Sequence, residues 1–167
     1  MAQENKVVAI AAIGAKTRAL GKSGDLLFKI PEDLERFRNL TRDHPVIMGR
    51  KTWESLPEGR RPLPRRTNIV LTRQEGYEAR GAVLVPSIEE ALAVAQKSLG
   101  HDRICIIGGG DIYKAALPYT DILELTLVHD DTEGDAHFPQ YGEFTKTLAR
   151  EEHFDHTPAY EYVTLSR

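Results

Sequence analysis

One carboxyl group stands at a position where it could do chemistry. Asp33 follows Pro31, whose fixed φ and missing N–H suit the start of a helix, so the spacing places Asp33 in a first helical turn. Leu34 and Phe37 follow at helical spacing, which sets an apolar face beside the acid. Such an acid either interacts with the helix dipole or lies in a pocket where it binds or protonates a substrate. From this stretch alone the dipole interpretation is favoured.

A glycine turn is the best candidate for a phosphate site. Residues 108–110 are three glycines between an apolar strand and a helix. Glycines let the backbone approach a pyrophosphate, and the start of a helix attracts it. The dinucleotide pattern G-x-G-x-x-G fails at its third glycine, where Tyr113 stands. The turn alone therefore predicts either a phosphate site or a purely structural tight turn.

Cations and hydroxyls follow two other predicted strands. Arg50, Lys51 and Thr52 lie at a strand-to-helix turn, and Thr72 and Arg73 end another strand. Each group alone is typical of a solvated surface. Two such groups at strand ends would suit an extra phosphate, since an arginine near a strand end accommodates the 2′-phosphate of NADP. The hypothesis for the cofactor therefore shifts from NAD to NADP.

An arginine-rich loop spans residues 60–66. A nucleic-acid patch is poorly supported there, because few aromatic residues accompany the arginines and the net charge of the chain is −3. An arginine held by a proline-stiffened loop can instead clamp a substrate carboxylate through two hydrogen bonds. We favour the carboxylate clamp.

Bulk properties limit the class of protein. A chain of 167 residues with 41% hydrophobic and 28% charged residues is typical of one globular domain, here residues 1–167. The single cysteine, Cys105, excludes an internal disulfide and is expected to be a buried, inert thiol. We see no signal peptide and no membrane span, which favours a cytoplasmic protein, with a monomer as the default. His129, Asp135 and His137 could form a metal cluster, but a surface hairpin is favoured and no metal is expected.

The order of elements predicts the fold class. The apolar pattern and turn residues predict strands at 7–13, 45–48, 68–72, 82–85, 103–107 and 122–129, and helices at 31–42, 49–56, 87–99 and 111–117. We expect a long loop over 14–30 and an antiparallel hairpin over 143–167. This order predicts a single-domain α/β fold with a mixed, mostly parallel central sheet, flanking helices and a C-terminal antiparallel hairpin.

Four segments, in order, resemble bacterial dihydrofolate reductases. The resemblance covers essentially the whole chain and implies an enzyme that moves a hydride from NADPH to 7,8-dihydrofolate. The product, 5,6,7,8-tetrahydrofolate, would serve one-carbon metabolism and thymidylate synthesis, and antifolate inhibitors would bind the same site. The four segments are PVIMGRKTWES at 45–55, RPLP at 61–64, IIGGGDIY at 106–113 and EGDAHFP at 133–139.

The resemblance implies roles on the substrate side. Asp33 would bind the pterin and assist protonation at N5 through water, and Thr126 would support Asp33. Phe28 stands where the family usually has tryptophan, so an indole donor that could hold water is missing. Arg66 would pair with the glutamate α-carboxylate, with Arg61 nearby. Further substrate contacts would be the carbonyl groups of Ile10 and Ile107 and the side chains of Leu34, Phe37, Leu56 and Leu63.

The resemblance also implies a cofactor side. Residues 19–26 would form a mobile lid over the nicotinamide, and Gly134 and Asp135 would contact it. The family has a cis peptide bond at the position of Gly108-Gly109. The implied cofactor contacts are Ala12, Ala19, Leu20, Gly21, Leu26, Arg50, Lys51, Thr52, Thr72, Arg73, Gly108, Gly109, Gly110, Asp111, Ile112 and Tyr113.

Two other functions remain as alternatives. The first is another NADPH-dependent reductase of the same fold, such as the pyrimidine reductases of riboflavin synthesis. Asp33 and the clamp at Arg66 argue against it, because they suit a pterin that carries a glutamate tail. The second is a nucleotide-binding regulatory module without catalysis, which predicts NADPH binding without turnover.

Overall fold

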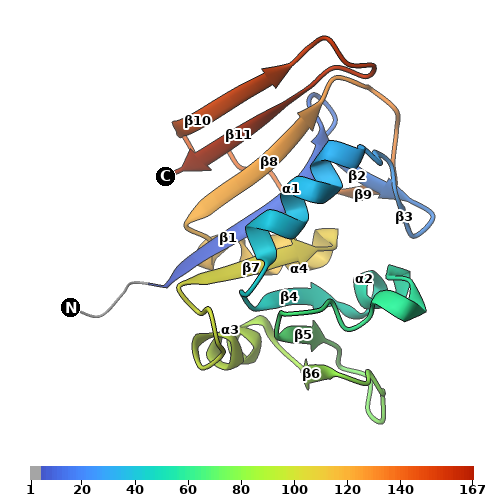
Figure 1. Cartoon of the computed structure of the whole chain (residues 1–167), viewed down its shortest axis with the longest axis vertical. Coiled ribbons are helices and arrows are strands. Elements are labelled where there is room, and N and C mark those ends of the chain that lie inside the picture. The colour runs from blue at the N-terminus through green and yellow to red at the C-terminus, as the bar shows by residue number, and fades with distance from the viewer. Residues whose placement is uncertain (1–4) are drawn as a thin grey trace.

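Eight strands form the central sheet, in the order β10-β11-β8-β1-β7-β4-β5-β6 (Figure 1). The computed structural model describes residues 5–167. The pairs from β8 through β6 are parallel, whereas β11 is antiparallel to both β8 and β10. The predicted sheet and C-terminal hairpin are therefore confirmed. The strands are β1 (Lys6–Gly14), β4 (Val46–Gly49), β5 (Asn68–Leu71), β6 (Ala82–Val85), β7 (Arg103–Gly108), β8 (Ile122–Val128), β10 (Lys146–His153) and β11 (Tyr160–Ser166).

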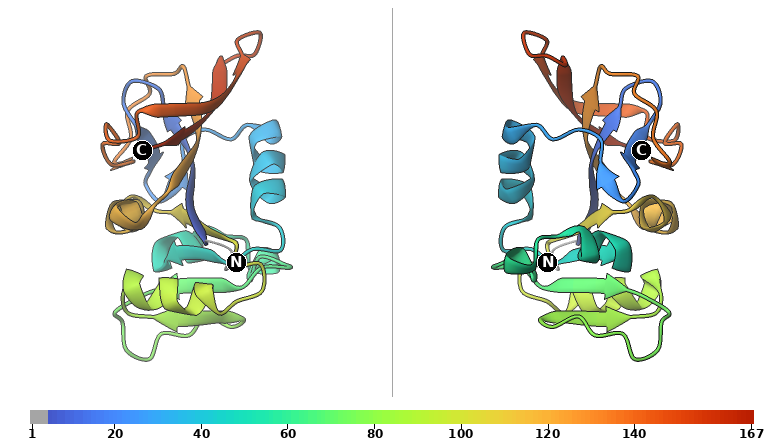
Figure 2. Two further views of the ribbon diagram at one scale, coloured as in Figure 1. Left: turned by 90° about the vertical axis from the view of Figure 1, so that its left-hand side faces the viewer. Right: turned by 90° about the vertical axis from the view of Figure 1, so that its right-hand side faces the viewer.

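Helices cover both faces of this sheet, with α1 on one side and α3 and α4 on the other (Figure 2). Alternate residues of a strand point to opposite faces. Val7 and Ala9 of β1 accordingly join the core that contains residues of α3 and α4, and Val8 and Ile10 join the core against which α1 packs. The helices are α1 (Pro31–Thr41), α2 (Arg50–Ser55), α3 (Ile88–Gln96) and α4 (Gly110–Ala116), with 3-10 turns η1 (Glu58–Arg60) and η2 (Leu117–Tyr119).

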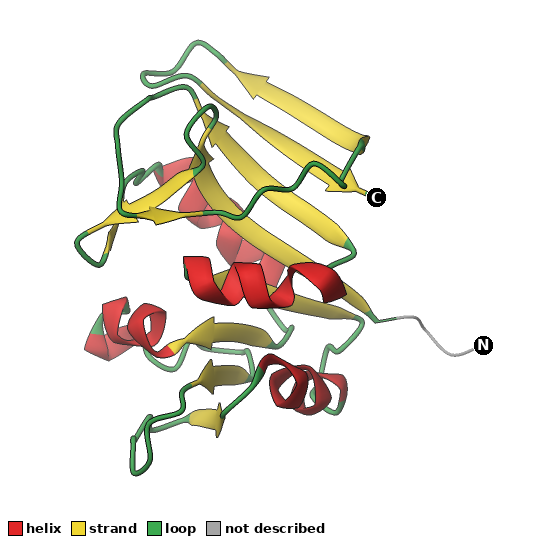
Figure 3. Cartoon of the chain, turned by 180° about the vertical axis from the view of Figure 1, so that it is seen from behind, coloured by secondary structure: helices red, strands yellow, loops and turns green. Residues whose placement is uncertain are grey.

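A second, small sheet corrects the expectation of an unbroken loop over 14–30. Strand β2 (Ala19–Lys22) lies between β3 (Asp25–Leu26) and β9 (Ala136–His137) (Figure 3). Asp135 fastens the pairing, because its N–H donates to Gly21 O at 2.9 Å and its carboxylate accepts from Ser23 N at 2.9 Å. Strands of two to four residues are too short to show an alternating pattern, which is why the prediction was wrong.

The predicted starts of α1 and α3 are confirmed, and α2 and α4 each begin within one residue of the predicted position. Helix α1 begins at Pro31, and Ser87 Oγ caps α3 by accepting from Glu90 N at 3.2 Å. Helix α3 ends at Gln96 rather than at residue 99, because its apolar face ends there and Leu99 is 90% exposed. Cys105 is buried as predicted, and burial raises the pKa of its thiol to about 12.

A close backbone crossing at Gly100 yields a stability prediction. Gly100 has φ +77°, and a Cβ there would lie 1.7 Å from Asp43 O. Backbone atoms cannot move away as a flexible side chain can, so Gly100→Ala combines φ strain with overpacking. We expect it to lower the free energy of unfolding by about 2–5 kcal/mol. For a chain of this size the melting temperature should fall by about 4–20 °C.

Gly76 provides the control for that experiment. It also has a positive φ, +73°, but a Cβ there would meet no atom within 4 Å. Gly76→Ala should therefore show only the strain of the left-handed backbone, about 1 kcal/mol. Equal losses in the two variants, measured by thermal and denaturant unfolding, would show that the contact with Asp43 is not what requires glycine at position 100.

Candidate active site

The carboxyl group of Asp33 lies in the first turn of α1 and faces β8. Thr126, which is buried, donates a hydrogen bond from its Oγ1 to Asp33 Oδ1 at a distance of 2.5 Å. Burial raises the pKa of Asp33, while the bond from Thr126 and the charge of Arg36 lower it by smaller amounts. Asp33 therefore keeps its proton to a higher pH than an exposed aspartate does. This geometry favours the pocket interpretation of Asp33 over the dipole interpretation.

An apolar and aromatic cluster surrounds the entry to α1. Phe28, which is 8% exposed, packs in one core cluster with Val128, Tyr160 and Tyr162. Phe28 carries no hydrogen-bond donor, so the polar groups in this cluster are the two phenols from β11. Burial is the largest cause that raises the pKa of both tyrosines, and the nearby charge of Asp33 adds to it.

The apolar face of α1 is left partly open. Leu34, one residue after Asp33, is 48% exposed, and Phe37 is only half-buried. On the same side of the sheet, four further predicted substrate contacts belong to or, like Phe37, pack against one core cluster with Val8. An exposed apolar surface beside a partly buried acid is what a flat, aromatic ligand with polar edges requires. The four residues are Ile10, Leu56, Leu63 and Ile107.

Arg66 is positioned by two hydrogen bonds. Its Nη1 donates to Thr41 Oγ1 at 2.9 Å, and its Nε donates to Pro64 O at 2.9 Å. Burial lowers the pKa of Arg66, and the nearby charges of Arg38 and Arg42 lower it further. An arginine among other cations, with guanidinium hydrogens left over, is suited to a carboxylate.

Arg61, which the resemblance places near Arg66, makes its described contacts with other residues. Its guanidinium lies 5.9 Å from the ring centre of Trp53, and it lines a separate cavity of about 330 Å³ with Tyr77 and Arg80. The charges that act on Arg66 come instead from α1 and the turn after it. The expectation that Arg61 lies near Arg66 came from the resemblance, and it stays a prediction.

The glycine turn ends β7 and begins α4. Gly108 has φ +122°, and a Cβ there would lie 3.3 Å from the ring of Tyr113. The Tyr113 hydroxyl donates to Ile10 O at 2.6 Å, which ties α4 to β1. The peptide bond between Gly108 and Gly109 is cis, as the resemblance implied.

A neighbouring turn meets the glycine turn. Strands β4 and β7 are parallel neighbours, with Met48 paired to Gly108, and α2 starts where β4 ends. A Cβ at Gly109 would meet, among the described residues, only Thr52 Oγ1, at 3.6 Å. The carboxyl ends of β4, β5 and β7 lie at one edge of the sheet, so residues 50–52, 72–73 and 108–113 are brought to the same place.

The remaining predicted cofactor residues differ in exposure. Lys51, Arg73 and Asp111 are exposed, whereas Arg50 is half-buried and bonds Glu54 at 3.0 Å. Ile112 packs against Gly49, where a Cβ would lie 2.9 Å from the Ile112 side chain. Thr72 Oγ1 accepts a hydrogen bond from Gln74 N at 3.1 Å.

The other predicted cofactor residues lie in β1 and in the predicted lid. Ala12 pairs in register with Thr126, which places Ala12 next to the hydrogen-bond partner of Asp33. Of the predicted lid, Ala19, Leu20 and Gly21 are buried in β2, and Leu26 is exposed in β3.

Three residues beside Asp33 were missed from the sequence. Arg36 follows Asp33 by one helical turn, Glu124 precedes Thr126 by two residues on β8, and Tyr162 pairs with Thr126 across β8 and β11. The strand period of two and the helix period of three to four place all three near the carboxyl group. These periods were available in the sequence, but the pairing of β8 with β11 was not.

Together, the fold and the site define a class of protein. A mostly parallel sheet with glycine and cationic turns at its carboxyl edge is typical of α/β enzymes that bind a nucleotide there. Within residues 5–167 no group of three His, Cys, Asp or Glu side chains is arranged to hold a metal ion. In the same described range, no helix has the length and apolar character needed to cross a membrane.

Comparisons with known proteins identify the family. A family model described as dihydrofolate reductase matches residues 6–167. The dihydrofolate reductase of Bacillus subtilis is 38% identical over 150 residues, covering 89% of this chain and 86% of that protein. Dihydrofolate reductase type 3 of Salmonella typhimurium is 38% identical over 165 residues, covering 96% and 98%. The chain therefore belongs to the dihydrofolate reductase family and is an oxidoreductase.

A solved structure agrees with this assignment. Dihydrofolate reductase from Enterococcus faecalis, complexed with NADP(H) and RAB-propyl, matches the fold with a TM-score of 0.85 at 34% sequence identity. The match covers 98% of this chain and 96% of that one. The resemblance inferred from the four sequence segments is thereby confirmed.

Proposed function

We propose that this chain reduces 7,8-dihydrofolate to 5,6,7,8-tetrahydrofolate with NADPH, and that Asp33 assists protonation at N5 through water. The observation that carries the proposal is the partly buried Asp33 carboxyl group, bonded to the buried Thr126 beside the open apolar face of α1. The family assignment supports the reaction, and the pairing of a proton-handling acid with a phosphate-binding edge supports the division of roles.

The edge of the sheet fits a phosphate-bearing cofactor. The backbone at Gly109 is open to close approach, since a Cβ there would meet only the Thr52 hydroxyl among the described residues outside its chain neighbours, and that hydroxyl is itself a hydrogen-bond donor. Arg50, Lys51 and Arg73 follow strands that end at the same edge, and their charges suit phosphate oxygens. These residues would hold NADPH, which supplies the hydride for the reaction.

The residues of this chain would prepare the substrate for that hydride. Asp33 Oδ1 is taken by Thr126, so Oδ2 remains to accept hydrogen bonds from the amino edge of a pterin. The raised pKa of Asp33 suits an acid that must exchange a proton near neutral pH. The hydride would add to C6 and the proton to N5, which together complete the reduction of that double bond. The exposed side chain of Leu34 and the lid that contains β2 and β3 would exclude water from the reacting atoms.

The rest of the proposal concerns the tail of the substrate and the setting of the enzyme. Arg66 would bind the glutamate α-carboxylate, and antifolate inhibitors with a pterin-like amino edge would compete for Asp33. We infer that the chain acts as one domain and as a monomer in the cytoplasm, and that its product enters one-carbon metabolism and thymidylate synthesis. The lone buried cysteine fits a reducing compartment.

The direct test follows the loss of reduced-nicotinamide absorbance when purified protein, NADPH and dihydrofolate are mixed. We expect turnover with dihydrofolate and a preference for NADPH over NADH. NADPH binding without turnover would support a regulatory module, and turnover only with a ribosylaminopyrimidine, whose sugar would be reduced to ribityl, would support a pyrimidine reductase. Either of these results would overturn the proposal.

The missing indole leads to a prediction for Phe28→Trp. An added N–H donor near Asp33 favours the ionised carboxylate, which lowers its pKa. We therefore expect activity to persist and the midpoint of the pH–rate profile to move to lower pH. Because Phe28 is buried in an aromatic cluster, the larger ring should also cost about 1–3 kcal/mol of stability.

Phe144→Trp serves as the control for that substitution. Phe144 is equally buried but belongs to the core on the face opposite α1. It should cost similar stability and leave the pH–rate profile and inhibitor affinity unchanged. If Phe28→Trp changes neither the profile nor inhibitor affinity, the water near Asp33 does not depend on the residue at position 28.

A further inference from the structure

A second polar contact between α1 and β8 lies next to the contact of Asp33 with Thr126. Arg36 Nη2 donates a hydrogen bond to Glu124 Oε2 at 2.7 Å, and Thr164 Oγ1 donates to the same oxygen at 2.8 Å. Glu124 and Thr126 are two residues apart on β8, so both point to the face that α1 covers. The two contacts therefore run side by side, one from each end of the first helical turn.

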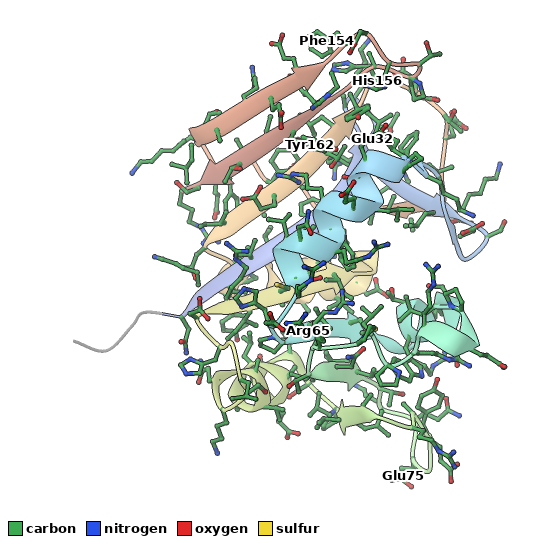
Figure 4. All side chains as sticks on the ribbon, viewed as in Figure 1. Glu32, Arg65, Glu75, Phe154, His156 and Tyr162 are labelled. Carbon is green, nitrogen blue, oxygen red and sulfur yellow. The ribbon has the colours of Figure 1, made fainter. Side chains whose placement is uncertain are left out.

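Tyr162 completes the support of Arg36. The guanidinium carbon lies 4.3 Å from the centre of the Tyr162 ring, and Tyr162 is paired with Thr126 across the two strands. Figure 4 shows Tyr162 close to Glu32, near the beginning of α1, and both residues line a cavity of about 390 Å³ together with Arg36. Arg36 is thus held by a carboxylate on one side and an aromatic face on the other.

The ion pair between Arg36 and Glu124 is partly exposed, and its effect on stability differs from its effect on Asp33. The Arg36 and Glu124 side chains keep 21% and 15% of their surface exposed. A pair of this kind adds little net stability, because the cost of removing two charges from water offsets most of their attraction. The ion pair matters more for the Asp33 carboxyl group nearby, because the positive charge of Arg36 is one of the causes that lower the pKa of Asp33.

We propose that Arg36 is a positioning residue for Asp33. Held on β8 and β11, its guanidinium fixes the turn of α1 that carries Asp33 and sets how tightly that carboxyl group holds its proton. The inference rests on the proposed function for its role in catalysis, whereas the effect on the proton can be measured without turnover. Glu124 acts with it, because its negative charge offsets part of the positive charge that Asp33 experiences.

Other ionisable groups also face these two residues and must be considered in the design. The charge of Asp33 acts on Tyr113, Tyr160 and Tyr162, and their hydroxyls remain neutral because burial, above all, raises their pKa values. Glu32, on the same helix, acts on Tyr160. The groups that line the cavity beside Arg36 are Glu32 and Glu35 from α1, Glu151 and His153 from β10, and Tyr162 from β11.

The test compares substitutions that change charge in opposite directions. Arg36→Gln removes the cation, so the protonated carboxyl group of Asp33 should persist to higher pH. Glu124→Gln removes the anion but keeps an amide oxygen that can accept from Arg36 and Thr164, so Asp33 should lose its proton at lower pH. Arg36→Lys keeps the charge and should return the midpoint close to that of the wild type.

Two readouts are measured on the full chain. The first is the titration of the Asp33 carboxyl carbon by NMR in the protein without ligands, assigned by its loss in Asp33→Asn. The second is the pH dependence of NADPH oxidation with dihydrofolate. Arg150→Gln is the matched control, since Arg150 contacts Glu161 at 3.8 Å on the opposite face of β11 and its loss should leave both midpoints unchanged.

The outcomes distinguish the inference from a structural role and from the proposed function. Opposite shifts for Arg36→Gln and Glu124→Gln, with Arg36→Lys close to the wild type, support the inference. Unchanged midpoints in all three variants, with only stability or activity lost, would overturn it. If Arg36→Gln does not fold, the shift in Glu124→Gln decides. If the wild type shows no turnover, the proposed function fails while the NMR titration still tests Arg36.

Discussion

Asp33→Asn is expected to lower kcat/KM for dihydrofolate reduction by about 100- to 10,000-fold at neutral pH, the range that a positioned acid or base contributes. Asparagine keeps nearly the same shape and can still accept a hydrogen bond from Thr126, but it cannot exchange a proton. The measurement is steady-state NADPH oxidation, and KM for NADPH should change little because the substitution leaves the glycine turn and the cations at the sheet edge unchanged.

The same variant should be more stable than the wild type at neutral pH. Burial raises the pKa of Asp33 above its ordinary value of 3.8, so ionising the folded protein costs more than ionising the unfolded chain. The wild type therefore loses stability as the pH rises from the unfolded pKa through the folded one. The advantage of Asp33→Asn should be present at neutral pH and should shrink as the pH falls below that window.

Asp155→Asn is the control for both readouts. Asp155 lies in the exposed turn between β10 and β11, with 88% of its side chain exposed. The substitution makes the same chemical change at the surface and should leave activity and stability nearly unchanged. Comparable rates for Asp33→Asn and Asp155→Asn at neutral pH would remove Asp33 from the proton chemistry.

Arg66→Gln is expected to raise KM for dihydrofolate about 10- to 150-fold, with a much smaller change in kcat. A hydrogen bond to a charged group contributes about 1.5–3 kcal/mol, and the clamp acts on the substrate tail, away from the reacting ring. KM should change more than kcat because the interaction with the tail should be about as strong in the ground state as in the transition state. Steady-state kinetics over a range of dihydrofolate concentrations would measure both constants.

Two comparisons make the Arg66 prediction specific. Arg65→Gln removes a neighbouring arginine whose guanidinium instead bonds Asp43 at 3.1 Å on the surface, and it should change KM little. A dihydropterin without the glutamate tail should be used equally well by wild type and Arg66→Gln. If Arg66→Gln weakens both substrates by the same factor, the arginine does not bind the tail carboxylate.

Local sequence rules were sufficient to predict where the helix that carries Asp33 begins and how the central sheet is arranged. Pro31 marks the first turn of α1, and the apolar strands with their order give the mostly parallel sheet, because these features depend on neighbours in the chain. The carboxyl ends of parallel strands then bring residues 50–52 and 108–110 to one edge. The positions of the Asp33 carboxylate and the glycine turn could therefore be predicted from the residues themselves, whereas their roles in binding came from the resemblance.

The long-range contacts that position Asp33 and influence its pKa could not be predicted from the residues alone. Thr126 lies 93 residues from Asp33, and Glu124 lies 88 residues from Arg36. Only the resemblance pointed to Thr126, and nothing pointed to Glu124, because the register of β8 against α1 depends on the packed fold. The small sheet of β2, β3 and β9 was missed because its strands are too short to show a pattern and because one of them comes from a distant part of the chain.

The most direct test of the central claim is the pH dependence of the hydride-transfer rate, measured in rapid mixing experiments on the wild type and on Asp33→Asn. With Asp33 present, the rate should level off at low pH, where the site is already protonated. Without it, the proton must come from solvent, so the rate should rise about tenfold for each unit fall in pH. Parallel profiles with the same midpoint in both proteins would contradict the role assigned to Asp33.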